Sequence, residues 1–323
     1  MGRKKISIHS GTFNEEGNIE EFYRRVKAVI SQHPEYDFEI VMADNCSKDN
    51  TRQIMRKIAA QDPSFKVIFN ANNFGATRSG MHNLMHQRIN SDAAVMMCSD
   101  LQDPPELIHD FIKKYEEGFE VVCAVKSKSK ENPLVFALRS LYYWLLKKIS
   151  DDELISGFTG FGLYDRKVIE AIRQYKDPNP YFRGMIAEIG FRRCCVEYTQ
   201  EKRKSGRSSY NFFGYYDFAM NGFVNHSKLP LRMAVFGGFF IAMISMLAAF
   251  GYFVYKLFNW ESFQVGMAPL VIGLFFFSAV QLIFIGILGE YIGAIYTHVK
   301  NKPYVIEDEL INFENNSSAD KNI

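Results

Sequence analysis

Oxygen-bearing side chains that could bind a cation follow three apolar segments early in the chain. These groups are Asn14-Glu15-Glu16, Asp44-Asn45, and Asp100 with Gln102 and Asp103. Carboxylate and amide oxygens one or two residues apart can share a hard divalent cation that bridges phosphate oxygens. A capped, solvated turn is the simpler interpretation of any one group. The repetition after three segments favours a site for a divalent ion and a diphosphate.

The elements before these groups predict how they are positioned. Strand-like runs at 6–10, 38–43, 66–69 and 93–97 alternate with helical patterns, which is typical of an α/β, doubly wound, mostly parallel sheet. Parallel strands place their carboxyl ends on one sheet edge, so the three groups should converge there. Neither a GxGxxG nor a Walker sequence is present, which disfavours dinucleotide and P-loop sites.

Segments between residues 121 and 207 give weaker indications of structure and function. Residues 121–124 and 191–198 are expected strands, whereas 157–162 is so rich in glycine that we expect its backbone to lie close to a ligand. The pattern at 132–150 predicts an amphipathic helix, either packed on the sheet or placed at a membrane interface. The basic segment 202–207 is either a solvated loop or a contact for anionic lipid headgroups or a lipid phosphate.

Two long apolar runs predict a membrane anchor. Met233 to Tyr255 and Ser262 to Gly289 contain no charged residue, and each exceeds the ~20 residues that cross a bilayer as a helix. We expect transmembrane helices at about 232–257 and 264–290, rather than buried core helices. Basic residues flank both runs, which predicts a multi-pass protein of the cell (inner) membrane with its N-terminal region in the cytoplasm.

Composition sets further bounds on the 323-residue chain. Its N-terminus lacks the apolar core of a signal peptide, and its five cysteines show no zinc spacing and are expected to be free thiols. The net charge of +2 says little by itself. We expect membrane lipids as partners, and no nucleic acid. The expected organisation is a domain at 1–198, a basic juxtamembrane segment at 199–230, spans within 231–297 and a tail at 298–323, disordered after Glu307.

Six motifs together resemble family 2 glycosyltransferases, in particular the polyprenyl-phosphate branch with bactoprenol glucosyltransferases and dolichyl-phosphate mannose synthase. They are Phe13-Asn14-Glu15-Glu16, Asp44 to Thr51, Asn73-Phe74-Gly75, Ser99 to Glu106, Arg203-x-x-Gly206-x-Ser208-x-Tyr210 and Leu288-Gly289-Glu290-Tyr291. The resemblance runs from Ile6 to about Val305. It implies a GT-A fold and an inverting transfer of sugar from a nucleotide sugar to a polyprenyl phosphate at the cytoplasmic leaflet.

The resemblance also implies roles for individual residues. The nucleotide sugar would contact Phe13, Asn14, Glu15, Asp44, Asn45, Asn73, Gly75 and Asp100, with Asp44 at the nucleobase. Asp100 and Gln102 would hold Mg²⁺ or Mn²⁺. The acceptor phosphate would be bound by Lys126, Arg139, Arg203 and Ser208. Asp100, Arg183 and Glu188 are the catalytic candidates, with Glu188 as an alternative base.

Two positions depart from the family pattern. The family's Asp-x-Asp-x-Gln has Cys98 at its first position, and Thr159-Gly160 stands where relatives often carry an acid. We expect Cys98 to be structural, because a thiolate suits soft ions rather than Mg²⁺.

The expected reaction is transfer of glucose from UDP-glucose to undecaprenyl phosphate, with GDP-mannose, UDP-GlcNAc and UDP-galactose as alternative donors. A catalytically silent membrane scaffold is the alternative from another class, and a processive polysaccharide synthase is disfavoured because it would need more spans. Small residues at Gly286, Gly289 and Gly293 could pack helix on helix in a homo-oligomer.

Overall fold

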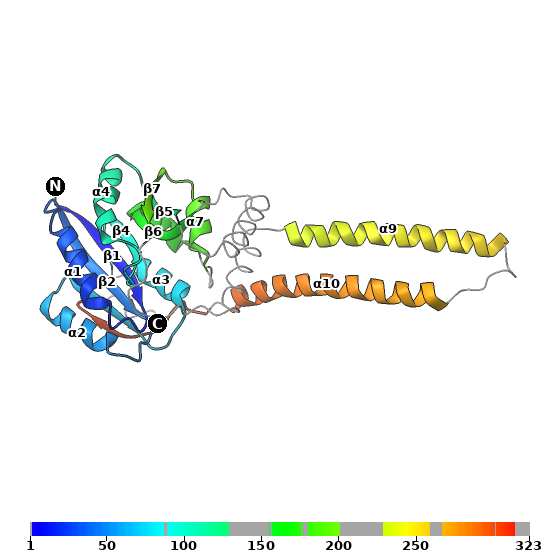
Figure 1. The fold of residues 1–323 in the computed structure, drawn as a ribbon, viewed down its shortest axis with the longest axis horizontal. Coiled ribbons are helices and arrows are strands. Elements are labelled where there is room, and N and C mark those ends of the chain that lie inside the picture. Colours follow the sequence, from blue (N-terminus) through cyan, green and yellow to red (C-terminus); the bar gives the residue numbers. More distant parts are fainter. Residues whose placement is uncertain are drawn as a thin grey trace.

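A mixed sheet organises the N-terminal part of the chain and holds a segment from its far end (Figure 1). The computed structural model describes residues 2–86, 89–128, 155, 157–175, 177, 180–200, 229–258, 267–300 and 302–313. The strands are β1 Lys4–Thr12, β2 Tyr36–Asp44, β3 Phe65–Asn70, β4 Ala93–Cys98, β5 Val121–Lys128, β6 Phe158–Asp165, β7 Arg193–Thr199 and β8 Glu307–Ile311.

The strand order confirms the expected convergence of the three strand exits that carry the polar groups, which are those of β1, β2 and β4. The order is β7-β5-β6-β4-β1-β2-β3-β8, in which β1 pairs in parallel with both β2 and β4. In this register Thr12 lies opposite Asp44, and Gly11 lies opposite Cys98. The sheet is mixed, because β6 runs antiparallel to β4 and β5, and β8 runs antiparallel to β3.

Helices cover both faces of this sheet. They are α1 Ile19–Ile30, α2 Thr51–Gln61, α3 Ala76–Leu84, the 3₁₀ turn η1 Pro105–Leu107, α4 Ile108–Glu116, α6 Arg166–Arg173 and α7 Phe182–Glu188. Apolar side chains of α1, α2 and α4 form one buried cluster with the sheet, and those of α3, α6 and α7 form a second. Alternating residues of β5 divide between the two clusters, as the two-residue period of a strand requires. We call this three-layer unit the sheet domain.

The glycine-rich segment forms a strand, and a close contact with a neighbouring strand accounts for one of its glycines. Gly162 is in β6, and a Cβ added there would lie 2.2 Å from the carbonyl oxygen of Val122 on β5. Glycine is therefore needed for the close approach of two strand backbones. The hydroxyl of Tyr164 donates to the Gly160 carbonyl oxygen at 2.7 Å and closes the same region.

The segment after Glu307 is also ordered, contrary to expectation. Residues 307–311 form β8, which pairs with β3 at the sheet edge. Arg56 of α2 forms an ion pair with Glu309, and the Asn312 amide donates to the Ala59 carbonyl oxygen at 2.8 Å. These contacts bind the segment to α2 although more than two hundred residues separate them in sequence. Residues 314–323 lie outside the described part of the chain.

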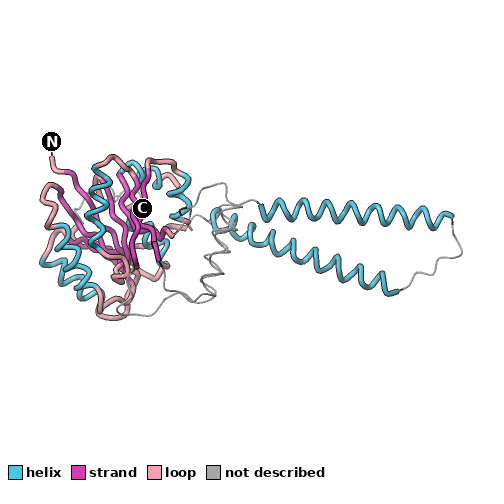
Figure 2. The backbone as a smooth tube through the Cα atoms, turned by 45° about the horizontal axis from the view of Figure 1, so that its top comes forward, coloured by secondary structure: helices cyan, strands magenta, loops and turns pink. Residues whose placement is uncertain are grey.

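Two long helices extend from the sheet domain side by side (Figures 1 and 2). They are α9 Leu229–Phe258 and α10 Met267–Val299. The stretch Phe276–Val299 is long and apolar enough to cross a membrane, whereas the apolar stretch Met233–Ala248 is shorter. The described residues thus contain one candidate span, and the two-helix transmembrane hairpin is not confirmed.

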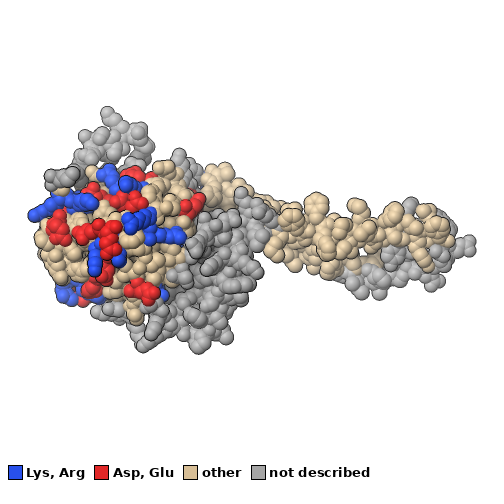
Figure 3. Space-filling view, turned by 90° about the horizontal axis from the view of Figure 1, so that it is seen from above, with Lys and Arg blue, Asp and Glu red and all other residues tan. Residues whose placement is uncertain are grey.

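The surface of the two helices differs from that of the sheet domain. In Figure 3 the visible charged side chains gather on the sheet domain, and none is visible on this face of the described part of the extension. Large apolar side chains are exposed along both helices, among them Phe239 at 75% and Leu282 at 68%. Isolated apolar side chains are common on soluble proteins, but a continuous apolar surface of this kind marks a contact with lipid or protein.

Candidate functional site

The loops after β1 and β2 are joined by hydrogen bonds. The Asn14 amide donates to the Ser47 hydroxyl at 2.8 Å, and the Asn14 side-chain oxygen accepts from the Lys48 amide at 2.8 Å. The Glu15 amide donates to the Thr51 hydroxyl at 2.9 Å. Asn14 has a φ of 53°, a left-handed conformation that asparagine tolerates. Phe13, Asn14 and Glu15 therefore sit in a loop that the second strand exit holds in place.

Asp44, the expected nucleobase contact, is buried at the end of β2. The Nε of Arg52 donates to its carboxylate at 2.7 Å, and the Ser47 amide donates to the same group at 3.1 Å. Arg52 also donates to the carbonyl oxygen of Asn70 at 2.6 Å. Asp44 thus fixes the loop through Arg52, while contact with a nucleobase stays a prediction.

Asn45 connects the second strand exit to the third. Its Nδ2 donates to the Asn73 side-chain oxygen at 2.8 Å, and its Oδ1 accepts from the Phe74 amide at 3.0 Å. The Gly75 amide donates to the same Asn73 oxygen at 2.9 Å. Gly75 has a φ of 84° and precedes α3, so a side chain there would strain the backbone. The structure therefore brings Asn45, Asn73 and Gly75 together, and their contact with a nucleotide sugar stays a prediction.

The acid motif after β4 forms a tight turn at the same edge. Leu101 has a φ of 59°, and the Gln102 amide donates to the Asp100 carboxylate at 3.2 Å. The Ser99 hydroxyl donates to the Gly11 carbonyl oxygen at 3.0 Å, which ties the turn to β1. Asp100 is 8% exposed and Asp103 is 4% exposed. The turn therefore presents two nearly buried carboxylates close to the first strand exit.

The charge of Lys126 on β5 and a hydrogen bond from Tyr198 on β7 both act on Asp103 of this turn. Burial raises the pKa of Asp103, and the negative charge of Asp100 raises it further. A hydrogen bond of 2.6 Å from the Tyr198 hydroxyl and the positive charge of Lys126 act in the opposite direction. Burial and the charge of Asp103 raise the pKa of Tyr198, so it stays a neutral donor. Lys126 therefore lies close enough to act on the acid motif.

The donor set fits a hard divalent cation. Asp100 and Gln102 supply oxygen atoms, which Mg²⁺ and Mn²⁺ prefer. The repulsion between Asp100 and Asp103 in a buried setting is what a bound cation would relieve. Cys98 lies at the exposed end of β4 and offers only a soft thiol.

The remaining predicted residues fall into two groups. Arg183 and Glu188 lie on α7, which packs against the sheet through Met185 and Ile186; Arg183 is partly buried and Glu188 is exposed. Arg139, Arg203 and Ser208 lie outside the described residues.

Sequence reasoning missed three features of the described structure. Arg52 and Tyr198 hold Asp44 and Asp103, and no local sequence signal joins either pair. A third group, His82, His86 and Glu307, brings its nitrogen and oxygen atoms within 4.8 Å of one another. Here the spacing of the two histidines, one turn apart on an expected helix, is a signal that could have been used.

A buried serine–histidine–asparagine chain elsewhere does not form a second active site. The Ser7 hydroxyl lies 2.7 Å from His9 Nε2, and His9 Nδ1 lies 3.2 Å from Asn83 Oδ1. Burial lowers the pKa of His9 to about 4, although its hydrogen bond with Asn83 opposes this. His9 is 2% exposed and the adjoining cavity is only about 10 Å³, so no substrate reaches it. This network holds α3 to β1.

Comparisons with known proteins agree with the resemblance seen in the motifs. Residues 7–173 match the family Glycosyl transferase family 2. The SfII prophage-derived bactoprenol glucosyl transferase of Shigella flexneri is 34% identical over 94% of this chain and 97% of its own. The uncharacterized glycosyltransferase YkcC of Bacillus subtilis (strain 168) is 34% identical over 96% and 95%.

A solved structure was also matched. The mannosyltransferase PcManGT from Pyrobaculum calidifontis, in complex with GDP-Man and Mn²⁺, is 15% identical, with a TM-score of 0.47 over 93% of this chain and 87% of its own.

Proposed function

This chain belongs to glycosyltransferase family 2, in the branch of the bactoprenol glucosyl transferases, and from that premise we propose that it transfers a sugar from a nucleotide sugar to a polyprenyl phosphate. The observation that carries the proposal is the 34% identity to the Shigella flexneri bactoprenol glucosyl transferase, which extends over 94% of this chain. The proposed acceptor is undecaprenyl phosphate. The proposed donor is UDP-glucose, with GDP-mannose and UDP-GlcNAc as alternatives.

The joined loops support a nucleotide-sugar site at the carboxyl edge of the sheet. In this proposal the loop of Phe13, Asn14 and Glu15, together with Asn45, Asn73 and Gly75, surrounds the nucleotide. Asp44 fixes the second loop through Arg52 and contacts the nucleobase from that position. Asp100 and Gln102 would hold Mg²⁺ or Mn²⁺, which when bound offsets the negative charge of the departing diphosphate.

The acceptor oxygen needs positioning more than it needs a base. A phosphate monoester has a second pKa of roughly 6 and is largely ionised at neutral pH. We propose that Lys126 binds this anion beside the donor, and its electrostatic effect on the acid motif supports the proposal. Arg139, Arg183, Arg203 and Ser208 are proposed as further phosphate contacts, and Glu188 as an alternative base.

We also propose that α9 and α10 anchor the enzyme as a two-helix hairpin in the cell membrane, with the sheet domain in the cytoplasm. Their exposed apolar side chains and the span-length stretch Phe276–Val299 support this placement. In the proposed organisation the basic segment 199–230 lies at the lipid surface. The small residues Gly286, Gly289 and Gly293 offer a packing surface for a second copy.

The test is a transfer assay with the full chain in detergent. Purified protein is incubated with undecaprenyl phosphate, Mg²⁺ or Mn²⁺, and one of UDP-glucose, GDP-mannose, UDP-GlcNAc or UDP-galactose, and lipid-linked product is measured by mass spectrometry. We expect product with UDP-glucose, and a loss of about 10²-fold or more in Asp100→Ala. The control is Asp110→Asn, an exposed acid in the first turn of α4.

Two outcomes would contradict the proposal. Metal-dependent nucleotide binding without product from any donor would instead support the silent scaffold, which Cys98 and Thr159-Gly160 make a real alternative. Equal activity in Asp100→Ala and the wild type would remove the acid motif from the proposed mechanism.

A further inference from the structure

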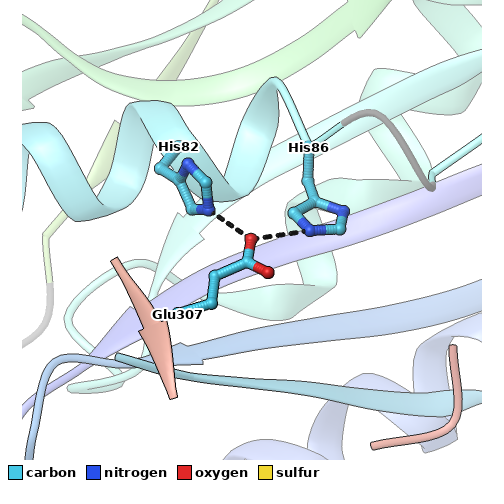
Figure 4. A group of neighbouring side chains, drawn as sticks. All are labelled: His82, His86 and Glu307. Atoms are coloured by element: carbon cyan, nitrogen blue, oxygen red, sulfur yellow. Dashed lines mark hydrogen bonds and ion pairs between the residues drawn. The ribbon is translucent and has the colours of Figure 1, made fainter. Parts of the chain in front are cut away.

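We propose that His82, His86 and Glu307 form a binding site for a divalent transition metal ion of the Zn²⁺ type. The two histidines lie one turn apart on α3 or at its end, and the glutamate begins β8 (Figure 4). Figure 4 shows both imidazole rings turned toward the same carboxylate. The site therefore joins two segments that are more than two hundred residues apart.

The candidate ligand atoms lie close enough together for small side-chain movements to bring them onto a shared ion. His82 Nε2 lies 2.7 Å and His86 Nε2 lies 2.9 Å from the same carboxylate oxygen of Glu307. All of the candidate ligand atoms lie within 4.8 Å of one another. A Zn²⁺ ion at about 2.0–2.1 Å from each ligand separates neighbours by about 2.9 Å at right angles and about 3.4 Å in a tetrahedron. To hold the ion in a tetrahedron, the two nitrogen–oxygen distances would lengthen by about 0.5–0.7 Å, and ligand atoms that lie as far as 4.8 Å apart would approach each other by about 1.4 Å.

The ligand types select a different metal from that of the acid motif. Two imidazole nitrogens and one carboxylate oxygen suit Zn²⁺ and its neighbours in the first transition row. Mg²⁺ prefers oxygen ligands such as those of Asp100 and Gln102. A set of two histidines and one glutamate leaves a fourth position for water. Exposures of 22% for the His82 side chain and 28% for that of Glu307 give solvent access to it.

The scaffold holds the three side chains in place before any ion arrives. Met81 and Leu84 anchor α3 in the core, and the ring of Phe313 packs 5.1 Å from that of His86.

Glu307 is fixed because it pairs with Asn70 of β3. Arg78 of α3 donates to the Pro303 carbonyl oxygen at 2.7 Å and tethers the chain just before Glu307. Little conformational entropy is therefore lost on binding.

One feature sets the expected strength of binding. Histidine ligands usually donate their second ring N–H to an acceptor, which improves metal affinity. His86 Nδ1 is buried, and the described part of the chain offers it no hydrogen-bond partner. We therefore expect micromolar affinity rather than the tighter binding of structural zinc sites. The bound ion would clamp β8 to α3, the helix that follows Gly75 at the proposed nucleotide site.

The test measures zinc binding to the full chain in detergent, purified with an affinity tag that contains no histidine. After chelator treatment and dialysis, zinc content is measured by elemental analysis and affinity by calorimetry. We expect one zinc ion per chain and a rise of several degrees in unfolding temperature with zinc. His82→Ala and Glu307→Gln should each weaken zinc binding by about tenfold or more.

Matched controls separate this site from others on the chain. His33 and His109 also lie close together, 2.7 Å between ring nitrogens, beside Glu35, so His33→Ala tests whether any histidine pair suffices. Asp100→Ala tests whether the zinc sits at the acid motif instead. Both controls should bind zinc as the wild type does. Because the readout is metal content and stability, the result is independent of the sugar transferred.

The proposal is overturned if chelated wild type takes up no zinc, or if His82→Ala and Glu307→Gln bind it as tightly as the wild type. The three side chains would then form only a hydrogen-bonded ion pair. Loss of zinc in Asp100→Ala alone would assign the ion to the acid motif and equally exclude the α3–β8 site.

Discussion

Cys98 is the side chain that most distinguishes the candidate site from its family. It lies at the exposed end of β4, two residues before Asp100, where the family carries its first acid. Burial raises the pKa of the Cys98 thiol, and the nearby charges of Asp103 and Asp100 raise it further, so the thiol stays neutral beside the acid motif. The thiol thus leaves the cation with fewer hard ligands than the turn can accommodate.

Restoring the acid should strengthen metal binding. In Cys98→Asp we expect the Mg²⁺ or Mn²⁺ concentration for half-maximal transfer to fall by about tenfold, because each added carboxylate raises affinity for a hard cation. The measurement is a metal titration of the transfer assay. Cys98→Ser is the control, since it removes the thiol without adding charge. An unchanged requirement in Cys98→Asp would show that the ion does not reach this end of the strand.

The contact between Tyr198 and Asp103 makes stability depend on pH. The pKa of Asp103 is raised above its unfolded value, so its ionisation costs stability at pH values above about 4. Tyr198 reduces this cost by donating a hydrogen bond to the carboxylate. Tyr198→Phe should therefore be less stable than wild type by about 1–2 kcal/mol at pH 8, with a smaller deficit near pH 4.

Thermal unfolding of the full chain at several pH values tests this prediction. Adding Asp103→Asn to the Tyr198→Phe variant should flatten the pH dependence of its stability, because no charge then forms at position 103. A deficit in Tyr198→Phe that is equal at pH 4 and pH 8 would mean that the lost contact is packing rather than charge.

Some of these residue contacts could be predicted and others could not. Asn14, Asp44 and Asp100 were placed together because each follows an apolar run, and parallel strands end on one edge. Arg52 and Tyr198 could not be identified in this way as partners of Asp44 and Asp103. Which side chains come within hydrogen-bond distance depends on the direction in which each side chain points in the fold. Neither strand period nor helix spacing encodes that direction across the fold.

At the scale of the elements, the close approach of the β5 and β6 backbones requires glycine at position 162 of β6. Gly162→Ala should destabilise the sheet domain by ~3 kcal/mol, since its Cβ would lie 2.2 Å from the Val122 carbonyl oxygen and both strands would have to move. Urea unfolding followed by circular dichroism measures the change. Gly11→Ala on β1 is the control, because nothing lies within 4 Å of an added Cβ there. Equal stability of the two variants would contradict the close approach.

The elements show where sequence patterns fail. The strands β1 to β4 are mostly buried, and the alternation of Ile6 and Ile8 with polar residues in β1 and the apolar runs in β2 to β4 predict them. The glycines of β6 suggested a ligand because a sequence cannot tell close approach to a strand from close approach to a substrate. The residues of β8 are Glu-Asp-Glu-Leu-Ile, and their strand form depends on β3 and on Arg56. Tertiary contacts overrode local propensity there.

At the scale of the whole molecule, β8 couples the end of the apolar extension back to the sheet domain. A chain that ends at Ile306 should lose about 2–4 kcal/mol of stability, because β3 becomes an open edge and Leu310 and Phe313 no longer pack on the apolar cluster that contains Ile68. Thermal unfolding and light scattering in detergent measure the loss and the expected aggregation.

A chain that ends at Phe313 keeps β8 and is the matched control. We expect its unfolding temperature to stay near that of the full chain, since the described contacts of this segment lie within 302–313. Equal loss of stability in both truncations would indicate that length, rather than the strand, matters.

The pairing of β3 with β8 also fixes an order of events during synthesis. Asn70 leaves the ribosome roughly 240 residues before its partner Glu307. At ~10 residues per second, the edge of β3 stays uncovered for about half a minute. Both apolar helices are made within that interval, so the sheet is completed only after they have emerged. The newborn chain therefore exposes the edge of β3 during most of translation, and among the described strands the last to be made, β8, is the one that covers it.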